Sequence, residues 1–209
     1  MDDLVVWAAD VGSIRQQRFG WCRAPARQVA SSGTDIRAFA AGITADLNVD
    51  YRVAVGFECP LFVPISTDPL GLTSARVGEG SRAWSVHAGA NSLVTGLTEC
   101  VWVFEQLRTL TNQAIRVTLD WQIFHGGGAD LFIWEAFISG MAKGDTHHKD
   151  AAIAAQAFWS VYPDISAANA VRAENPYSLV GAALLRAGLS DDLTLLSQPC
   201  IVIKASPAP

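Results

Sequence analysis

Lysine is scarce in this chain of 209 residues, which contains 12 arginines but only 3 lysines, and charged residues make up 17% of it. The formal net charge is −5, which argues against a uniformly basic nucleic-acid coat protein and leaves room for a local basic patch. No uninterrupted apolar run approaches the roughly 20 residues of a membrane span. The chain starts Met-Asp-Asp rather than with a basic secretory segment, so we expect a cytoplasmic protein with no membrane contact.

The cysteines are few and far apart, and none forms a C-x-x-C pair, which excludes a zinc knuckle and a thioredoxin-type motif. They are Cys22, Cys59, Cys100 and Cys200. We expect them to be small buried apolar residues. The P-loop pattern G-x-x-x-x-G-K-(S/T) and the nucleophile elbow G-x-S-x-G are also missing.

Apolar residues are abundant at 50%, and the mean hydropathy is +0.24. A chain of this size can bury a core without disulfides or a structural metal, and we expect one domain over residues 1–209. Residues 61–90, rich in Gly, Pro, Ser and Arg, predict an irregular insertion, and residues 160–209 predict a C-terminal extension with a helix and a strand.

Strands and helices are expected to alternate after an opening antiparallel hairpin. Apolar runs predict strands over residues 4–10, 19–23, 52–58, 130–138 and 200–204. Helical spacing predicts helices over residues 34–47, 91–110, 147–159 and 177–187, while residues 115–119 fit either type. This order predicts an α/β protein with a mixed central sheet.

Four acidic residues stand out by their positions on these elements. Asp10 and Glu58 close strands, Glu135 lies within a strand, and Asp150 lies in the first turn of an alanine-rich helix. Carboxylates held that close together repel one another, and a divalent cation usually neutralises such an arrangement. Two such cations about 3.5–4 Å apart can activate water for phosphodiester cleavage.

Residue spacing supports a shared site. Side chains alternate along a strand, so Asp10 and Glu58 each occupy a defined face of their strand. Gly12 allows a phosphate or a metal close to the backbone. His147 and Asp150 are three residues apart on a helix and therefore point the same way.

Several segments that carry these acids resemble a known superfamily of proteins. Residues 5–13 (VVWAADVGS) and 19–21 (FGW) resemble the opening hairpin of the ribonuclease H-like superfamily, in the style of RuvC-type Holliday-junction resolvases. Residues 146–152 (THHKDAA) resemble the H-x-x-D-A helix that closes the resolvase site. The strand ending in Glu58-Cys59-Pro60 and the helix start at Asp150 also resemble the predicted RNase H-like nuclease families, over most of residues 4–160.

The resemblance implies an RNase H-like three-layer domain and a metal-dependent nuclease acting on nucleic acid. By resemblance, Asp10, Glu58 and Asp150 would bind Mg²⁺ or Mn²⁺, His147 would be a fourth catalytic residue, and Glu135 an accessory one. Glu135 could instead pair with an arginine. Resolvases of this type dimerise, so a homodimer is also implied.

The loop arginines Arg15, Arg18, Arg76 and Arg82 are candidates for phosphate contacts, and Trp84 could stack on a base. Two alternatives remain open. The acidic composition favours a non-catalytic RNase H-like scaffold or ligand-binding protein. An actin-like or sugar-kinase-like phosphotransferase also opens with D-x-G but usually needs a much longer chain.

Overall fold

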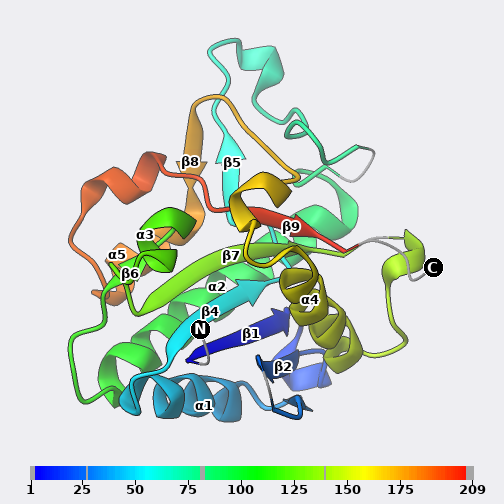
Figure 1. Ribbon diagram of the computed structural model, residues 1–209. Coiled ribbons are helices and arrows are strands. Elements are labelled where there is room, and N and C mark those ends of the chain that lie inside the picture. The colour runs from blue at the N-terminus through cyan, green and yellow to red at the C-terminus, as the bar shows by residue number, and fades with distance from the viewer. Residues whose placement is uncertain (1–2, 27, 81–82, 139, 206–209) are drawn as a thin grey trace.

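The computed structural model describes residues 3–26, 28–80, 83–138 and 140–205. A central sheet is covered by helices on both faces (Figure 1). The strands are β1 Leu4–Asp10, β2 Gly20–Pro25, β3 Ser31–Gly33, β4 Arg52–Phe57, β5 Phe62–Pro64, β6 Val117–Thr118, β7 Leu131–Phe137, β8 Pro176–Ser178 and β9 Val202–Lys204. The helices are α1 Ile36–Asn48, α2 His87–Leu110, α3 Trp121–His125, α4 His147–Val161 and α5 Leu179–Ala187.

The main sheet has the strand order β3-β2-β1-β4-β7-β6; β6 pairs with the start of β7 and β9 with its end. β1 and β2 form the predicted antiparallel hairpin, with Asp10 opposite Gly20. β1, β4 and β7 then run parallel to one another, so their carboxyl ends lie at one edge. The prediction of an α/β protein with a mixed sheet is confirmed, and the predicted strand over residues 4–10 matches β1.

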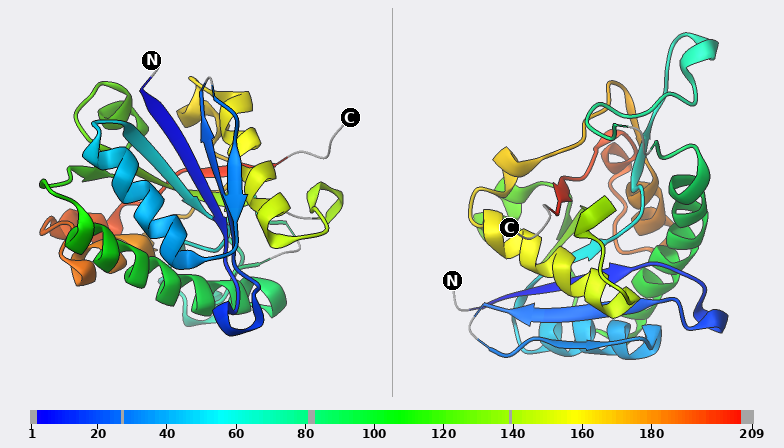
Figure 2. Two further views of the ribbon diagram at one scale, coloured as in Figure 1. Left: turned by 90° about the horizontal axis from the view of Figure 1, so that it is seen from below. Right: turned by 90° about the vertical axis from the view of Figure 1, so that its right-hand side faces the viewer.

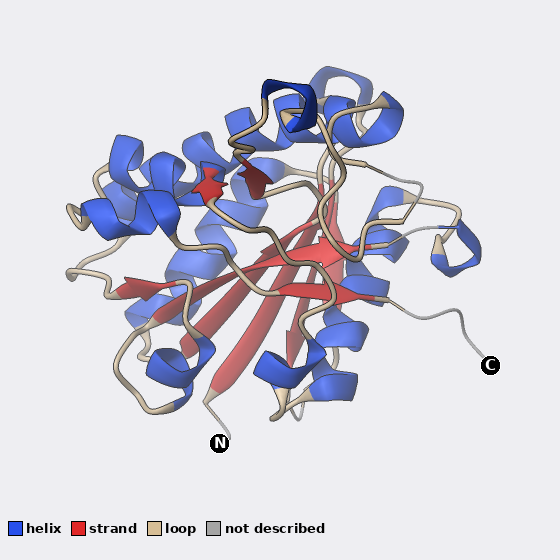
Figure 3. Cartoon of the chain, turned by 90° about the horizontal axis from the view of Figure 1, so that it is seen from above, coloured by secondary structure: helices blue, strands red, loops and turns tan. Residues whose placement is uncertain are grey.

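Helices cover both faces of the sheet (Figures 2 and 3), and each face has its own apolar core. On one face, Val5 and Val53 pack with α1, α2 and α5. On the other, Val6 and Ala54 pack with α3 and α4. The alternation is what a strand buried on both faces requires, and it gives three layers, α/β/α.

The predicted insertion, residues 61–90, and the predicted extension, residues 160–209, pair with each other through short strands. Within residues 61–80 and 83–90, β5 pairs with β8, which lies in the extension, and Val77 bridges to Arg172. Helix α5 packs its apolar face into the core beneath α2. The extension therefore completes the fold, and its helix begins at Leu179 rather than at residue 177 because residues 176–178 are paired as β8. No helix in the described ranges is both long and apolar enough to cross a membrane.

Candidate metal centre

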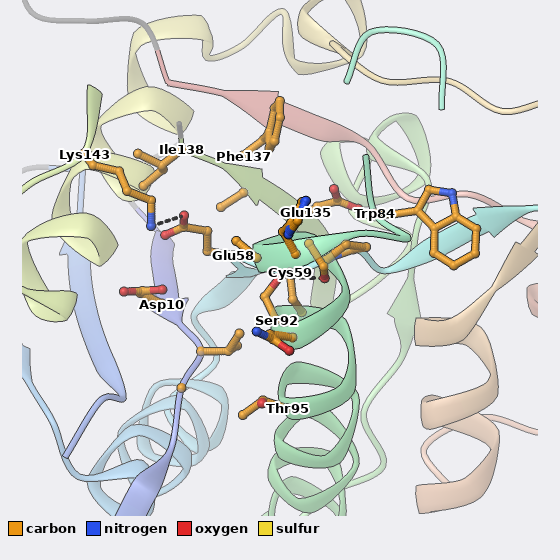
Figure 4. Close-up of a pocket in the computed structure, with 18 of the residues that line it drawn as sticks. Asp10, Glu58, Cys59, Trp84, Ser92, Thr95, Glu135, Phe137, Ile138 and Lys143 are labelled. Carbon is orange, nitrogen blue, oxygen red and sulfur yellow. Dashed lines mark hydrogen bonds and ion pairs between the residues drawn. The ribbon is translucent and has the colours of Figure 1, made fainter. Parts of the chain in front are cut away.

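Three of the predicted acids meet at the carboxyl edge of the sheet. Asp10 ends β1, Glu58 follows β4, and Asp150 lies in the first turn of α4. One carboxylate oxygen from each lies within 4.8 Å of one from each of the other two. Asp10 and Asp150 are buried and Glu58 nearly so, and Asp10 and Glu58 line a pocket (Figure 4).

Strand alternation and one close backbone approach bring these acids together. Asp10 and Glu58 continue the faces of Val6 and Ala54, which point toward α4. Gly20, opposite Asp10 in the hairpin, lies against the first residues of α4. A Cβ there would lie 2.2 Å from the His147 carbonyl carbon, so only glycine lets α4 start next to Asp10.

The cluster is electrostatically unfavourable while its carboxylates are charged and unneutralised. Burial raises the pKa of Asp10 to about 7; Lys143 lowers it and the charge of Asp150 raises it. Burial also raises the pKa of Glu58 to about 8, with the charge of Asp10 adding to the effect. Glu58 Oε2 is buried and no donor reaches it. Two facing carboxyl groups in this condition need either a proton or a cation between them.

His147 and Asp150 complete the cluster, as their helical spacing predicted. The Nδ1 atom of His147 is hydrogen bonded to Asp10 Oδ2. Asp150 Oδ1 accepts a hydrogen bond of 2.6 Å from the backbone of Gly144, which fixes its carboxylate. The first turn of a helix also favours the negative charge of Asp150.

Lys143 is a member of the site that the sequence analysis missed. Its Nζ lies 3.2 Å from Glu58 Oε1 and 3.7 Å from Asp150 Oδ2, and the side chain is 43% exposed. Burial lowers the pKa of Lys143, but the attraction of Glu58, Asp10 and Asp150 outweighs it and raises the pKa. The residue follows a short 3₁₀ helix, Gly140–Ala142, where no periodicity places a side chain.

Glu135 does not join this cluster, although it lines the same pocket, and its accessory catalytic role stays a prediction. In the β4–β7 register it stands beside Phe57, on the sheet face opposite to Asp10 and Glu58. There its carboxylate accepts hydrogen bonds of 2.6 and 2.8 Å from Arg76 and one of 2.9 Å from the Leu61 amide. The alternative of an arginine partner is the one that the structure shows.

Arg76 is correspondingly not placed for a phosphate contact, because its side chain is only 1% exposed. It bonds Glu79, Glu135 and the Phe62 carbonyl, and its guanidinium lies over the Phe62 ring. Burial lowers the pKa of Arg76, and the two carboxylates more than offset this and raise it. This buried ion network fastens residues 61–80 to the end of β7.

Replacing Arg76 by Met is therefore expected to lower the free energy of unfolding by about 3–5 kcal/mol, because Glu79 and Glu135 are left buried without their partner. Urea unfolding followed by circular dichroism measures the effect. The matched control is Arg116→Met, which breaks the exposed ion pair with Asp130 and should change stability little. A loss for Arg76→Met no larger than that of the control would contradict the assigned role.

The other predicted phosphate contacts lie at or beyond the rim of the pocket. Arg18 lines the pocket, and Arg15 is exposed in the neighbouring 3₁₀ helix, Ile14–Gln16. Arg82 lies outside the described residues. Trp84 is half-buried and lines the pocket, and its indole N–H donates to the Ser74 carbonyl.

Glu99 is a second residue that the sequence analysis missed. It lies on the buried face of α2, and the Gly12 amide donates to its carboxylate while Oε2 has no partner. Burial raises its pKa to about 8, with Asp10 adding to the shift. A carboxylate at helical spacing among buried residues such as Gly96 and Val103 is the signal that could have found it.

A scan against protein-family models found no match, and searches of curated proteins and of solved structures found no similar protein.

Proposed function

We propose that this protein is a metal-dependent phosphodiesterase, a nuclease in the broad sense, of the ribonuclease H-like superfamily. The observation that carries the proposal is the convergence of Asp10, Glu58 and Asp150 within 4.8 Å. The buried, partnerless Oε2 of Glu58 is the independent sign that a ligand belongs there. An all-oxygen donor set suits a hard cation such as Mg²⁺ or Mn²⁺.

The fold supports the superfamily assignment. An opening antiparallel hairpin is followed by parallel strands that alternate with helices. The acids occupy the end of the first strand, the end of a later strand and the start of a late helix, as the sequence resemblance implies.

The carboxylates, His147 and Lys143 have different roles in the proposed reaction. Asp10, Glu58 and Asp150 would hold a divalent cation, which would supply Lewis-acid polarisation and lower the pKa of a water molecule. His147 holds the Asp10 carboxylate in orientation through its hydrogen bond. The Lys143 ammonium lies 3.2 Å from Glu58 Oε1, and with a cation neutralising that carboxylate it would be free to donate a hydrogen bond to a phosphate oxygen.

One observation favours the alternative of a non-catalytic protein of the same fold. The Lys143 ammonium already lies between Glu58 and Asp150, so an internal cation partly neutralises the cluster. In that alternative, added Mn²⁺ would find no site to which it binds.

A cleavage assay separates the two functions. The purified protein is incubated with labelled single strands, duplexes, RNA–DNA hybrids, junctions and dinucleotides, with Mn²⁺, with Mg²⁺ and with chelator. We expect cleavage that requires the metal and stops with chelator. Absence of cleavage for every substrate and metal, together with an unchanged melting temperature on adding Mn²⁺, would contradict the proposed function and support the non-catalytic alternative.

A further inference from the structure

The acid cluster opens into a pocket of about 680 Å³. Asp10, Glu58 and Lys143 lie at one end and Trp84 at the other, with Ser92 on α2 between them (Figure 4). Pockets of this volume accommodate one small organic ligand. A bound phosphoester whose phosphorus lies near the acids would therefore extend its organic group toward Trp84.

The wall of the pocket around Trp84 is held in place by interactions within the protein, without a bound ligand. The Arg76–Glu135 ion network fastens residues 61–80 to the sheet at distances of 2.6 and 2.8 Å. Two further hydrogen bonds tie the segment around Trp84 back to residues 73 and 74, from the Trp84 indole and the Ser85 hydroxyl. The wall around Trp84 is therefore held by contacts within the protein itself.

The charges around the pocket do not suit a long polyanion. Among the described lining residues the acids are Asp10, Glu58, Glu79 and Glu135, against the bases Arg18, Arg76 and Lys143 and the histidines His87 and His147. Arg76 is hydrogen bonded to two carboxylates, and Lys143, which is paired with Glu58, offers at most one contact, to the phosphate at the acid cluster. Arg18, exposed at the rim, is the described lining arginine that could contact a phosphate. Polynucleotide binding needs a succession of such contacts, and the chain as a whole carries a net charge of −5.

The walls between the two ends are largely apolar. Val11, Val86, Phe137 and Ile138 line the pocket together with the half-buried ring of Trp84. Apolar walls beside a few polar groups are typical of small-ligand sites and suit a planar ring better than a charged backbone.

We infer that the substrate is a small phosphodiester of about dinucleotide size, one base of which occupies the apolar end of the pocket beside Trp84, rather than a polynucleotide. This inference rests on the proposed function, because it places the scissile phosphate at the acid cluster.

The test compares substrates of increasing length in Mn²⁺: the dinucleotide thymidylyl-thymidine and a 12-nucleotide oligothymidylate, each over a range of salt concentrations. We expect kcat/KM, expressed per cleavable bond, to differ less than about threefold between them, and log kcat/KM to fall with log salt by no more than about one, as for one phosphate contact. A 12-mer preferred tenfold or more, with a slope steeper than about −3, would overturn the inference and leave the proposed function standing.

A matched pair of variants tests the pocket itself. Trp84→Ala should raise KM for the dinucleotide about tenfold, since base stacking on an aromatic ring contributes about 1–3 kcal/mol. Trp102→Ala, which alters a separate hollow beside Ile14, should leave KM unchanged. Equal effects of the two variants would contradict the assignment of the base to this pocket.

Binding of thymidine monophosphate, measured by calorimetry in Ca²⁺, provides a readout that needs no cleavage. Binding that is lost in Trp84→Ala, in a protein that cleaves nothing, would support the ligand assignment and contradict the phosphodiesterase. Absence of both binding and cleavage would overturn both.

Discussion

Asp10→Asn is expected to reduce metal-dependent cleavage by about three orders of magnitude or more, because removing one ligand from a three-carboxylate site forfeits several kcal/mol of transition-state stabilisation. The same change should make the metal-free protein more stable at pH 8, by roughly 1–3 kcal/mol. The reason is that Asp10 is buried next to Glu58 and Asp150, and its charge is unfavourable there. Steady-state kinetics and urea unfolding measure the two effects on one preparation.

Asp191→Asn is the matched control, since it makes the same change of charge in an exposed loop between α5 and the 3₁₀ helix Leu193–Ser197. It should change neither cleavage nor stability appreciably. Substitution of an acid that binds a ligand is expected to raise the free energy of unfolding of the ligand-free protein. Substitution of an acid in a structural ion pair would instead lower it. Unimpaired cleavage by Asp10→Asn, in a folded protein, would remove Asp10 from the chemistry.

The metal-free protein should lose stability as the pH rises from about 5 to 8. Asp10 has a folded pKa of about 7 against an ordinary 3.8, and Glu58 one of about 8 against 4.5. Between those values the folded chain holds protons that the unfolded chain has released, so stability is full at low pH and declines through the folded pKa. Each group contributes up to about 1.4 kcal/mol per pH unit, and the sum is several kcal/mol.

Other acids with shifted pKa values do not hide the loss of stability between pH 5 and 8. Asp3 and Asp130 have lowered pKa values through their hydrogen bonds to Arg52 and Arg116, so their contributions are lost only below about pH 4. Glu99 has a raised pKa and adds to the decline. Unfolding curves in urea at several pH values, with chelator, measure the total.

Saturating Mn²⁺ should flatten this pH dependence, because the cation replaces the protons that the cluster otherwise needs. The stabilisation by Mn²⁺ is then larger at pH 8 than at pH 5, and reaches about 2.7 kcal/mol at a hundredfold excess over Kd. Glu99→Gln should reduce the slope without altering the response to Mn²⁺. A metal-free stability that is level or rises between pH 5 and 8 would contradict the electrostatics described for Asp10 and Glu58.

The sequence located site residues where apolar and polar residues alternated as in a strand or recurred at helical spacing. The strand over residues 4–10 and the alternation in residues 52–58 placed Asp10 and Glu58 on defined strand faces, and helical spacing placed His147 with Asp150. Those residues are the ones that the structure brings together.

The remaining features depend on contacts between distant segments. β7 is apolar on both faces, so alternation alone could not say which core its Glu135 faces; the register with Phe57 decides it. The Arg76 network and the β5–β8 pairing join an irregular segment to residues over 50 positions away. Lys143 lies outside any helix or strand, where no repeating pattern fixes a side-chain direction.

A crystal of the protein soaked in Mn²⁺, with an anomalous difference map, shows whether the three carboxylates bind a divalent cation. We expect a manganese peak about 2.0–2.6 Å from carboxylate oxygens of Asp10, Glu58 and Asp150, with Lys143 withdrawn from Glu58. A map with no peak at these three residues, and with Lys143 still in contact with Glu58, would contradict this expectation.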